Sequence, residues 1–221
     1  MKNYPNNQNP YTIVAEFEER VAEWTGAKYG VAVESGTAAL FLSLMYHRSL
    51  HPETNFLGRI TIPKHTYPSV PCSIIHAGGV IDWSDESWEG EYELKPLEIW
   101  DSALRFKKDM YHGGLQCLSF HIKKHLPIGR GGMILTDSLE ASNWLKKARF
   151  DGRSPVPLLE DDFTQLGWNC YMEPASAARG IQLFEVLRNK DLPDLKVADQ
   201  GYPNLSKFPV YTQGQDKENV L

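Results

Sequence analysis

Apolar residues recur at helical spacing in four stretches of the chain. Over residues 11–24 they appear every three or four positions with Glu and Arg between them, and Gly26 then marks a helix end. The same spacing predicts helices over residues 38–46, 139–148 and 173–187. A shorter helical turn is expected at residues 73–77, just before a pair of glycines.

Short apolar, β-branched runs lie between these helices. They predict six strands, at residues 29–33, 60–62, 80–83, 97–100, 115–120 and 132–136. Strands that alternate with helices indicate an α/β domain with a mostly parallel sheet, and ligands bind at the carboxyl ends of such strands. Residues 84–93 are acidic and aromatic without a clear period, and we interpret them as a surface connection.

Composition narrows the class of protein further. The 221 residues are 42% hydrophobic and 23% charged, as in ordinary soluble domains. A net charge of −5 argues against a nucleic-acid binder, and no apolar run approaches the ~20 residues of a membrane span. Residues 1–10 lack the layout of a signal peptide and are expected to be flexible. Three scattered cysteines are typical of free thiols in a reducing cytosol, so we expect a cytoplasmic protein without a metal site.

The segment from Ser119 to Gly132 carries the strongest candidate chemistry. It sets a hydroxyl five residues before Lys124 and follows the lysine with a glycine cluster. A lysine whose pKa is lowered by burial or by a neighbouring cation can hold an aldehyde cofactor as a Schiff base. Because Lys123 and Lys124 are adjacent, we expect only one of them to point into a given pocket. Taken alone, the segment favours an exposed basic turn between two strands, because charge runs are usually exposed.

Three further groups of polar residues follow predicted strands. Ser35-Gly36-Thr37 opens a helix, where free backbone N–H groups make an anion site, although such a triplet is more often only a helix cap. Asp101 ends a strand, where its carboxylate could pair with a protonated pyridine nitrogen or simply cap the next turn. Tyr67 lies in a proline-rich loop and could stack on a flat ring, or pack half-buried.

Six blocks of the chain, in order, resemble the DegT/DnrJ/StrS sugar aminotransferases, which are fold-type I pyridoxal phosphate enzymes. The blocks are residues 31–40 (AVAVSSGTAAL in the family), 62–67 (VPSLTF), 77–82 (AGATPVFVD), 100–103 (EDAA), 119–132 (SFHPTKNLTTGEGG) and 166–187 (LGYNYRMSELQAAIGLAQL). Six blocks in the same order are far more specific than any one of them.

The resemblance implies a role for each candidate residue. Lys124, not Lys123, falls on the family's Schiff-base lysine, because it lies five residues after Ser119. Asp101 would pair with the pyridine nitrogen of the cofactor, and Tyr67 would cover its ring. The cofactor phosphate would be held by Ser35, Gly36, Thr37 and Ser119, and by Asn169 of the neighbouring subunit in a homodimer.

The resemblance also implies a fold and a reaction. The fold would be a mostly parallel sheet with helices on both faces over residues 11–188, with the usual small C-terminal domain reduced to residues 189–221. The cofactor would be pyridoxal 5′-phosphate, and the reaction a ping-pong transamination in which Lys124 acts as general base. The amino donor would be glutamate, and the acceptor a nucleotide-linked keto-sugar.

The chain departs from the family pattern at several positions. Leu104 stands where the family usually has His or Gln, Arg130 replaces a Glu, and Tyr171 replaces an Arg. A complete strand–helix unit is missing between Asp82 and Trp100. Three interpretations therefore stay open: a working aminotransferase, a pyridoxal phosphate-binding protein with weak or lost activity, and a non-catalytic scaffold completed by a partner chain.

Overall fold

The structure is a computed structural model that describes residues 9–54 and 57–212. Most of the flexible N-terminus predicted at residues 1–10 lies outside the described residues, and so does the end of the reduced segment predicted at residues 189–221. Within the described residues, no helix is long and apolar enough to cross a membrane.

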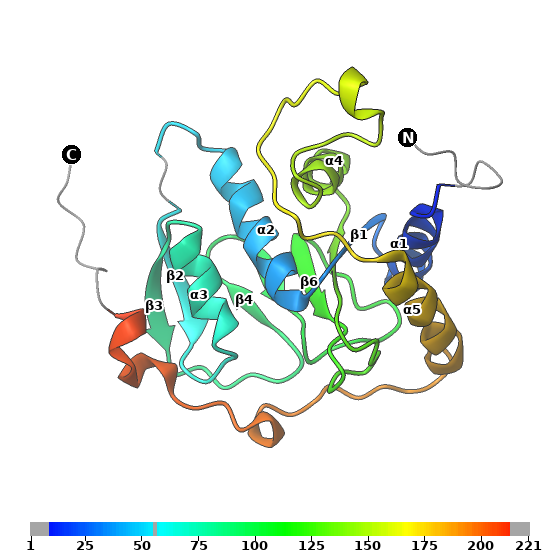
Figure 1. Cartoon of the computed structure of the whole chain (residues 1–221). Coiled ribbons are helices and arrows are strands. Elements are labelled where there is room, and N and C mark those ends of the chain that lie inside the picture. The colour runs from blue at the N-terminus through cyan, green and yellow to red at the C-terminus, as the bar shows by residue number, and fades with distance from the viewer. Residues whose placement is uncertain (1–8, 55–56, 213–221) are drawn as a thin grey trace.

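Helices and strands follow the hydrophobic pattern closely (Figure 1). The α-helices of the described chain are α1 Thr12–Thr25, α2 Gly36–Ser49, α3 Ser69–His76, α4 Leu139–Ala148 and α5 Pro174–Leu187. Its strands are β1 Tyr29–Val33, β2 Arg59–Pro63, β3 Val80–Ser84, β4 Tyr92–Leu94, β5 Ile99–Asp101, β6 Leu115–Ser119 and β7 Gly132–Thr136. The four predicted helices and six predicted strands are confirmed, with ends that differ by up to three residues.

The prediction of a mostly parallel sheet is wrong. The larger sheet has the order β1-β7-β6-β5-β4, and only β5 and β6 run parallel in it. β2 and β3 form a separate parallel pair, joined to the end of β4 by an antiparallel bridge between Thr61 and Lys95. A parallel neighbour needs a crossover of a dozen or more residues, usually a helix, whereas β4 and β5 are joined by residues 95–98 alone. The short connection between β4 and β5 therefore gives an antiparallel hairpin.

The expected surface connection at residues 84–93 is also wrong in part. Its end forms the start of β4, where Tyr92 is only 4% exposed and Leu94 is fully buried. A three-residue strand is too short to show a period of two, so the hydrophobic pattern did not predict β4.

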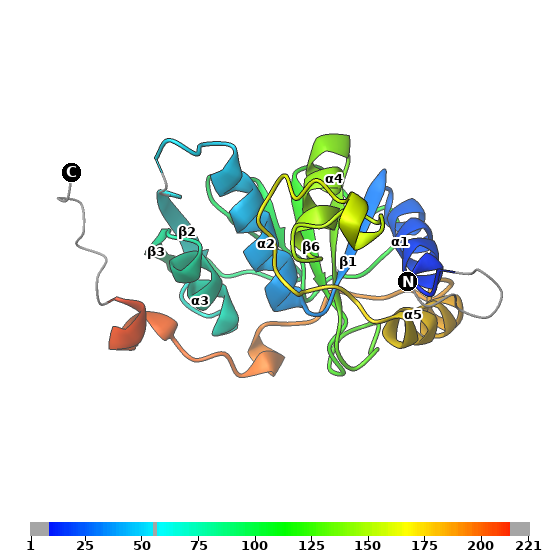
Figure 2. The same ribbon diagram turned by 45° about the horizontal axis from the view of Figure 1, so that its top comes forward.

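Two apolar cores cover the two faces of the larger sheet, which confirms helices on both faces. Alternate residues of one strand serve different cores: Val31 and Val33 face α2 and α4, whereas Ala32 faces α1 and α5. Phe17 of α1 and Phe184 of α5 are fully buried in the second core. Burial of each of these side chains stabilises the fold by roughly 1.5–3 kcal/mol. Figure 2 shows α1 and α5 side by side, away from α2 and α3.

The chain beyond α5 builds no further layer in the described residues. It runs beneath the lower ends of α2 and β6 toward β3, with 3-10 turns at Ala198–Gln200, Leu205–Lys207 and Pro209–Tyr211 (Figure 1). The N-terminal end of α2 is the end that faces this segment.

Candidate functional site

One cavity of about 280 Å³ collects seven of the eight residues predicted from the sequence. They come from the start of α2, the loop after β2, the end of β5 and the β6–β7 connection: Ser35, Gly36, Thr37, Tyr67, Asp101, Ser119 and Lys124. Asn169 is the exception, since it does not line the cavity and its Nδ2 donates to Asp151 Oδ2 at 3.1 Å. Residues that are up to 89 positions apart in sequence therefore meet at one place.

The start of α2 forms the part of the cavity suited to an anion. Ser35 caps the helix, because its Oγ accepts the amide N–H of Ala38 at 3.0 Å. The amides of Gly36 and Thr37 lie in the first turn, so the helix itself gives them no acceptor. A Cβ built on Gly36 would lie 2.9 Å from Cβ of Ser119, so only glycine lets the helix start approach the serine this closely. Amides, hydroxyls and the positive helix end together suit a phosphate group.

Asp101 supplies a buried carboxylate at the end of β5. Its Oδ1 accepts the amide N–H of Ala103 at 3.1 Å, and its Oδ2 accepts the hydroxyl of Tyr92 at 3.1 Å. The hydroxyl oxygen of Tyr92 lies 2.6 Å from Oγ1 of Thr66, so the Thr66 hydroxyl can donate to Tyr92 while Tyr92 donates to Asp101. Burial raises the pKa of Asp101, while these donors and the charge of Lys124 pull it down. The carboxylate both caps the next turn and lines the cavity, so the two roles considered for it do not exclude each other.

Lys124 lies in the turn that follows β6. Its backbone N–H bonds to the carbonyl of His121 at 2.8 Å, which bends the chain into the cavity. Burial lowers the pKa of the Lys124 amine; the negative charge of Asp101 opposes that shift, and the positive charge of Lys123 adds to it. Within the described residues the Lys124 amine has no hydrogen-bond or ion-pair partner, so it is available to a ligand.

The expectation that only one of the adjacent lysines points into a pocket is wrong. Both Lys123 and Lys124 line the cavity, because a turn does not send successive side chains to opposite sides as a strand does. The two lysines differ instead in burial: Lys123 is exposed and Lys124 is partly buried. Burial, not direction, makes Lys124 the better candidate for a lowered pKa.

Aromatic side chains that the sequence argument did not select form another part of the wall. Tyr67 is 56% exposed and contacts the ring of Tyr202 edge-on, with 6.1 Å between centroids. Trp88 lies nearly parallel to Tyr202 at 6.5 Å, with 17° between the ring planes. Trp88 and Tyr202 lie in segments with no regular pattern, and the only signal for either was an aromatic residue among polar ones.

Arg130, one of the departures from the family pattern, has a partner within the chain. Its Nη2 lies 2.7 Å from Oε2 of Glu34, at the edge of the cavity. Glu34 is itself a departure, since it stands where the family opening has a serine. The two changes form one exposed ion pair, a contact that contributes at most about 1 kcal/mol to stability.

Comparisons of the sequence with known proteins point to one family. A sequence model of the DegT/DnrJ/EryC1/StrS aminotransferase family matches residues 6–89 and 108–196. SpsC, a spore coat polysaccharide biosynthesis protein of Bacillus subtilis, is 25% identical over 230 residues, covering 84% of this chain and 57% of SpsC. Residues 90–107, which include Asp101, fall between the two matched parts. The family match therefore does not cover Asp101, and the role assigned to it is supported by its place in the cavity.

Two solved structures illustrate the similarity in fold. AtS13 of Actinomadura melliaura is 22% identical with a TM-score of 0.65, covering 81% of this chain and 61% of AtS13. PseC of Helicobacter pylori, an aminotransferase involved in the biosynthesis of pseudoaminic acid, is 16% identical with a TM-score of 0.66, covering 84% and 59%. These likenesses show the fold, and this chain spans about six-tenths of the length of these relatives.

Proposed function

The chain belongs to the DegT/DnrJ/EryC1/StrS aminotransferase family, and on that premise we propose that it holds pyridoxal 5′-phosphate on Lys124 and transfers amino groups. The donor we propose is glutamate, and the acceptor is a nucleotide-linked keto-sugar. The observation that carries the proposal is the convergence of an unpaired amine, a buried carboxylate and a helix start on one cavity.

The residues of the cavity fit the cofactor group by group. The amides of Gly36 and Thr37 with the hydroxyls of Ser35 and Ser119 suit its phosphate, and the close approach of Gly36 to Ser119 leaves room for nothing larger than hydrogen on that glycine. Asp101 provides the carboxylate that a protonated pyridine nitrogen needs, and the exposed face of Tyr67 is free to cover a flat ring.

The cofactor and the side chains of the cavity would supply different parts of the chemistry. When bound, pyridoxal phosphate supplies an aldehyde for attachment and an electron sink for the substrate carbon. Lys124 would provide the amine that attaches it and, once released, would act as the general base that moves a proton from the substrate carbon to the cofactor. Asp101 would provide the carboxylate for the ring nitrogen; burial raises its pKa, and the N–H of Ala103 and the hydroxyl of Tyr92, which both donate to it, oppose that shift.

Adding glutamate to the cofactor-loaded protein tests the proposal. We expect the visible absorbance band of the attached cofactor to convert to the band of pyridoxamine phosphate, with one 2-oxoglutarate released per site. A band that forms but does not change when glutamate is added would instead support a binding protein with weak or lost activity. That binding protein is the second candidate, because the chain spans only 57% of the length of SpsC. A protein that forms no band would favour the scaffold.

The pH dependence of cofactor attachment follows from the lowered pKa of Lys124. Only the neutral amine attacks an aldehyde, and a lowered pKa makes that form available at lower pH. We therefore expect the initial rate of band formation to level off below the ordinary lysine pKa of about 10.4. Stopped-flow absorbance across a pH series measures this midpoint, with N-α-acetyl-lysine as the unburied reference. A midpoint at or above that of the reference would contradict the assignment.

We also propose that two copies of the chain associate as a homodimer and share their active sites. Asn169 is exposed outside its own cavity, as a residue that reaches a neighbour must be. The preceding residues carry exposed apolar side chains, with Leu159 at 100% and Leu166 at 87% exposure. Such side chains are typical of a protein–protein contact.

A further inference from the structure

The segment of residues 189–205, here called the strap, crosses from α5 to the loop after β2. Within the described residues, four hydrogen bonds join backbone atoms of the strap to the larger body of the chain. Their partners are His125 Nε2 and the Pro193 carbonyl (2.8 Å), the Leu195 amide and the Leu104 carbonyl (2.9 Å), His65 Nδ1 and the Tyr202 carbonyl (3.0 Å), and the Leu205 amide and the Lys64 carbonyl (2.9 Å). His125 follows Lys124 directly, so one of these bonds ties the strap to the turn that carries the lysine.

An ion cluster fixes the start of the strap. The guanidinium of Arg105 donates to both carboxylate oxygens of Asp194, with Nε 3.1 Å from each and Nη2 2.6 Å from Oδ2. Arg105 also contacts Glu91, whose side chain is 6% exposed. Bidentate pairing of this kind combines strength with a defined orientation. Asp194 packs so closely on Gly90 that a Cβ there would lie 2.4 Å from its Oδ2.

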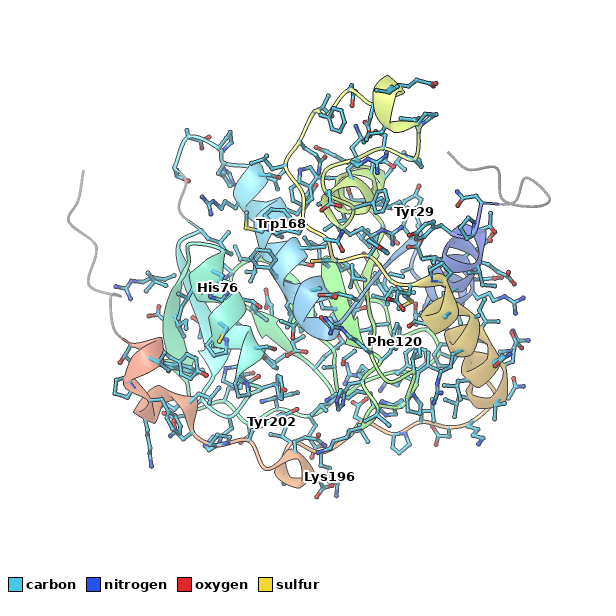
Figure 3. All side chains as sticks on the ribbon, in the orientation of Figure 1. Tyr29, His76, Phe120, Trp168, Lys196 and Tyr202 are labelled. Atoms are coloured by element: carbon cyan, nitrogen blue, oxygen red, sulfur yellow. The ribbon has the colours of Figure 1, made fainter. Side chains whose placement is uncertain are left out.

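The consequence of these anchors is the position of Tyr202. Its ring lines the cavity together with Gln200 of the same strap, and it lies between Tyr67 and Trp88. Figure 3 shows Tyr202 on the strap, beneath the strand ends. The hydroxyl of Tyr202 has no hydrogen-bond partner in the described part of the chain, so the ring and not the hydroxyl accounts for its packing.

We infer that Tyr202 is a positioning residue: held by the strap, its ring forms a wall of the cavity and limits access to the amine of Lys124. The inference rests on the proposed function only in treating this cavity as the cofactor site. The strap would then help to exclude water and small molecules from the reacting amine.

Chemical labelling of the full chain without cofactor tests this inference. The probe is sulfo-N-hydroxysuccinimide acetate, which acetylates free amines, and peptide mass spectrometry gives the rates at Lys124 and at the exposed Lys123. The rates are measured over a pH series and converted to rate constants of the neutral amines, so that a change in the pKa of Lys124 does not enter the ratio. We expect Tyr202→Ala to raise the Lys124:Lys123 ratio about tenfold, since it opens the wall locally.

Two variants serve as controls. Tyr202→Phe keeps the ring and is expected to label like the unaltered chain, which a role of the hydroxyl would not allow. Tyr211→Ala removes a tyrosine that packs on Trp83 outside the cavity, and it should also leave the ratio unchanged. If Tyr202→Ala does not fold, Asp194→Asn is used instead, because it weakens the anchor of the strap. We expect it to raise the Lys124:Lys123 ratio about threefold.

An unchanged ratio in folded Tyr202→Ala, or in Asp194→Asn, would overturn the inference. The measurement needs no cofactor, so it separates the two proposals. A chain that fails to bind pyridoxal phosphate yet shows the tenfold rise would refute the proposed function and leave the role of Tyr202 standing.

Discussion

Lys124→Ala is expected to abolish the visible absorbance band that the protein develops with pyridoxal phosphate, whereas Lys123→Ala keeps it. Both lysines line the cavity, but Lys124 is the more buried of the two, and this burial lowers the pKa of its amine. Loss of the attaching amine also removes the general base, so transfer of amino groups from glutamate should fall by about 10²- to 10⁴-fold. Absorbance titration and single-turnover kinetics measure the two effects.

Lys123→Ala is the matched control, because it removes the same charge from the neighbouring position. It should retain the band and change the glutamate reaction by only a few-fold. The reverse pattern, with the band lost in Lys123→Ala and kept in Lys124→Ala, would overturn the assignment. Similar loss in both variants would show that the turn, and not one amine, is required.

Asp101→Asn is expected to slow the reaction with glutamate by about 10²- to 10⁴-fold while the cofactor still attaches. Removing one partner of a buried charge pair costs roughly 3–5 kcal/mol, and each 1.36 kcal/mol is a factor of ten in rate. The asparagine oxygen can still accept from Ala103 or Tyr92, so the fold should persist. The pKa of Lys124 should fall further, since the charge of Asp101 raises it. Attachment of the cofactor would then level off at lower pH.

Asp85→Asn controls for the loss of a carboxylate charge. Asp85 is exposed, pairs with Lys64 at 2.7 Å and does not line the cavity. Stopped-flow absorbance with glutamate compares the two variants, and thermal melting checks their folding. A rate for Asp101→Asn within about threefold of that for Asp85→Asn would mean that Asp101 only caps the turn after β5.

Much of the candidate site was predictable because its residues follow apolar strands. Asp101 at the end of β5 and Ser119 at the end of β6 were placed by the hydrophobic pattern, and the strand ends then brought them together. The choice of Lys124 over Lys123 stays a prediction that rests on the resemblance, because the argument from their side-chain directions failed. That argument assumed the alternation of a strand, and Lys124 lies in a turn.

The parts that were not predictable depend on long-range contacts. The direction of β4 follows from the short connection to β5, but a three-residue strand leaves too little pattern to be recognised. Tyr202 reaches the cavity on a strap that is anchored in part by the pairing of Asp194 with Arg105, 89 positions earlier in the chain. Similarly, Arg130 looked like an isolated departure until the structure paired it with Glu34. No local propensity records such pairings.

The most direct test of the central claim is to find where the cofactor is attached. The full chain is loaded with pyridoxal phosphate, reduced with borohydride and digested, and the modified peptide is sequenced by mass spectrometry. The account predicts one pyridoxyl group per chain, on Lys124, with Lys123 unmodified. Attachment at Lys123, scattered labelling of exposed lysines, or no stable attachment at all would contradict it.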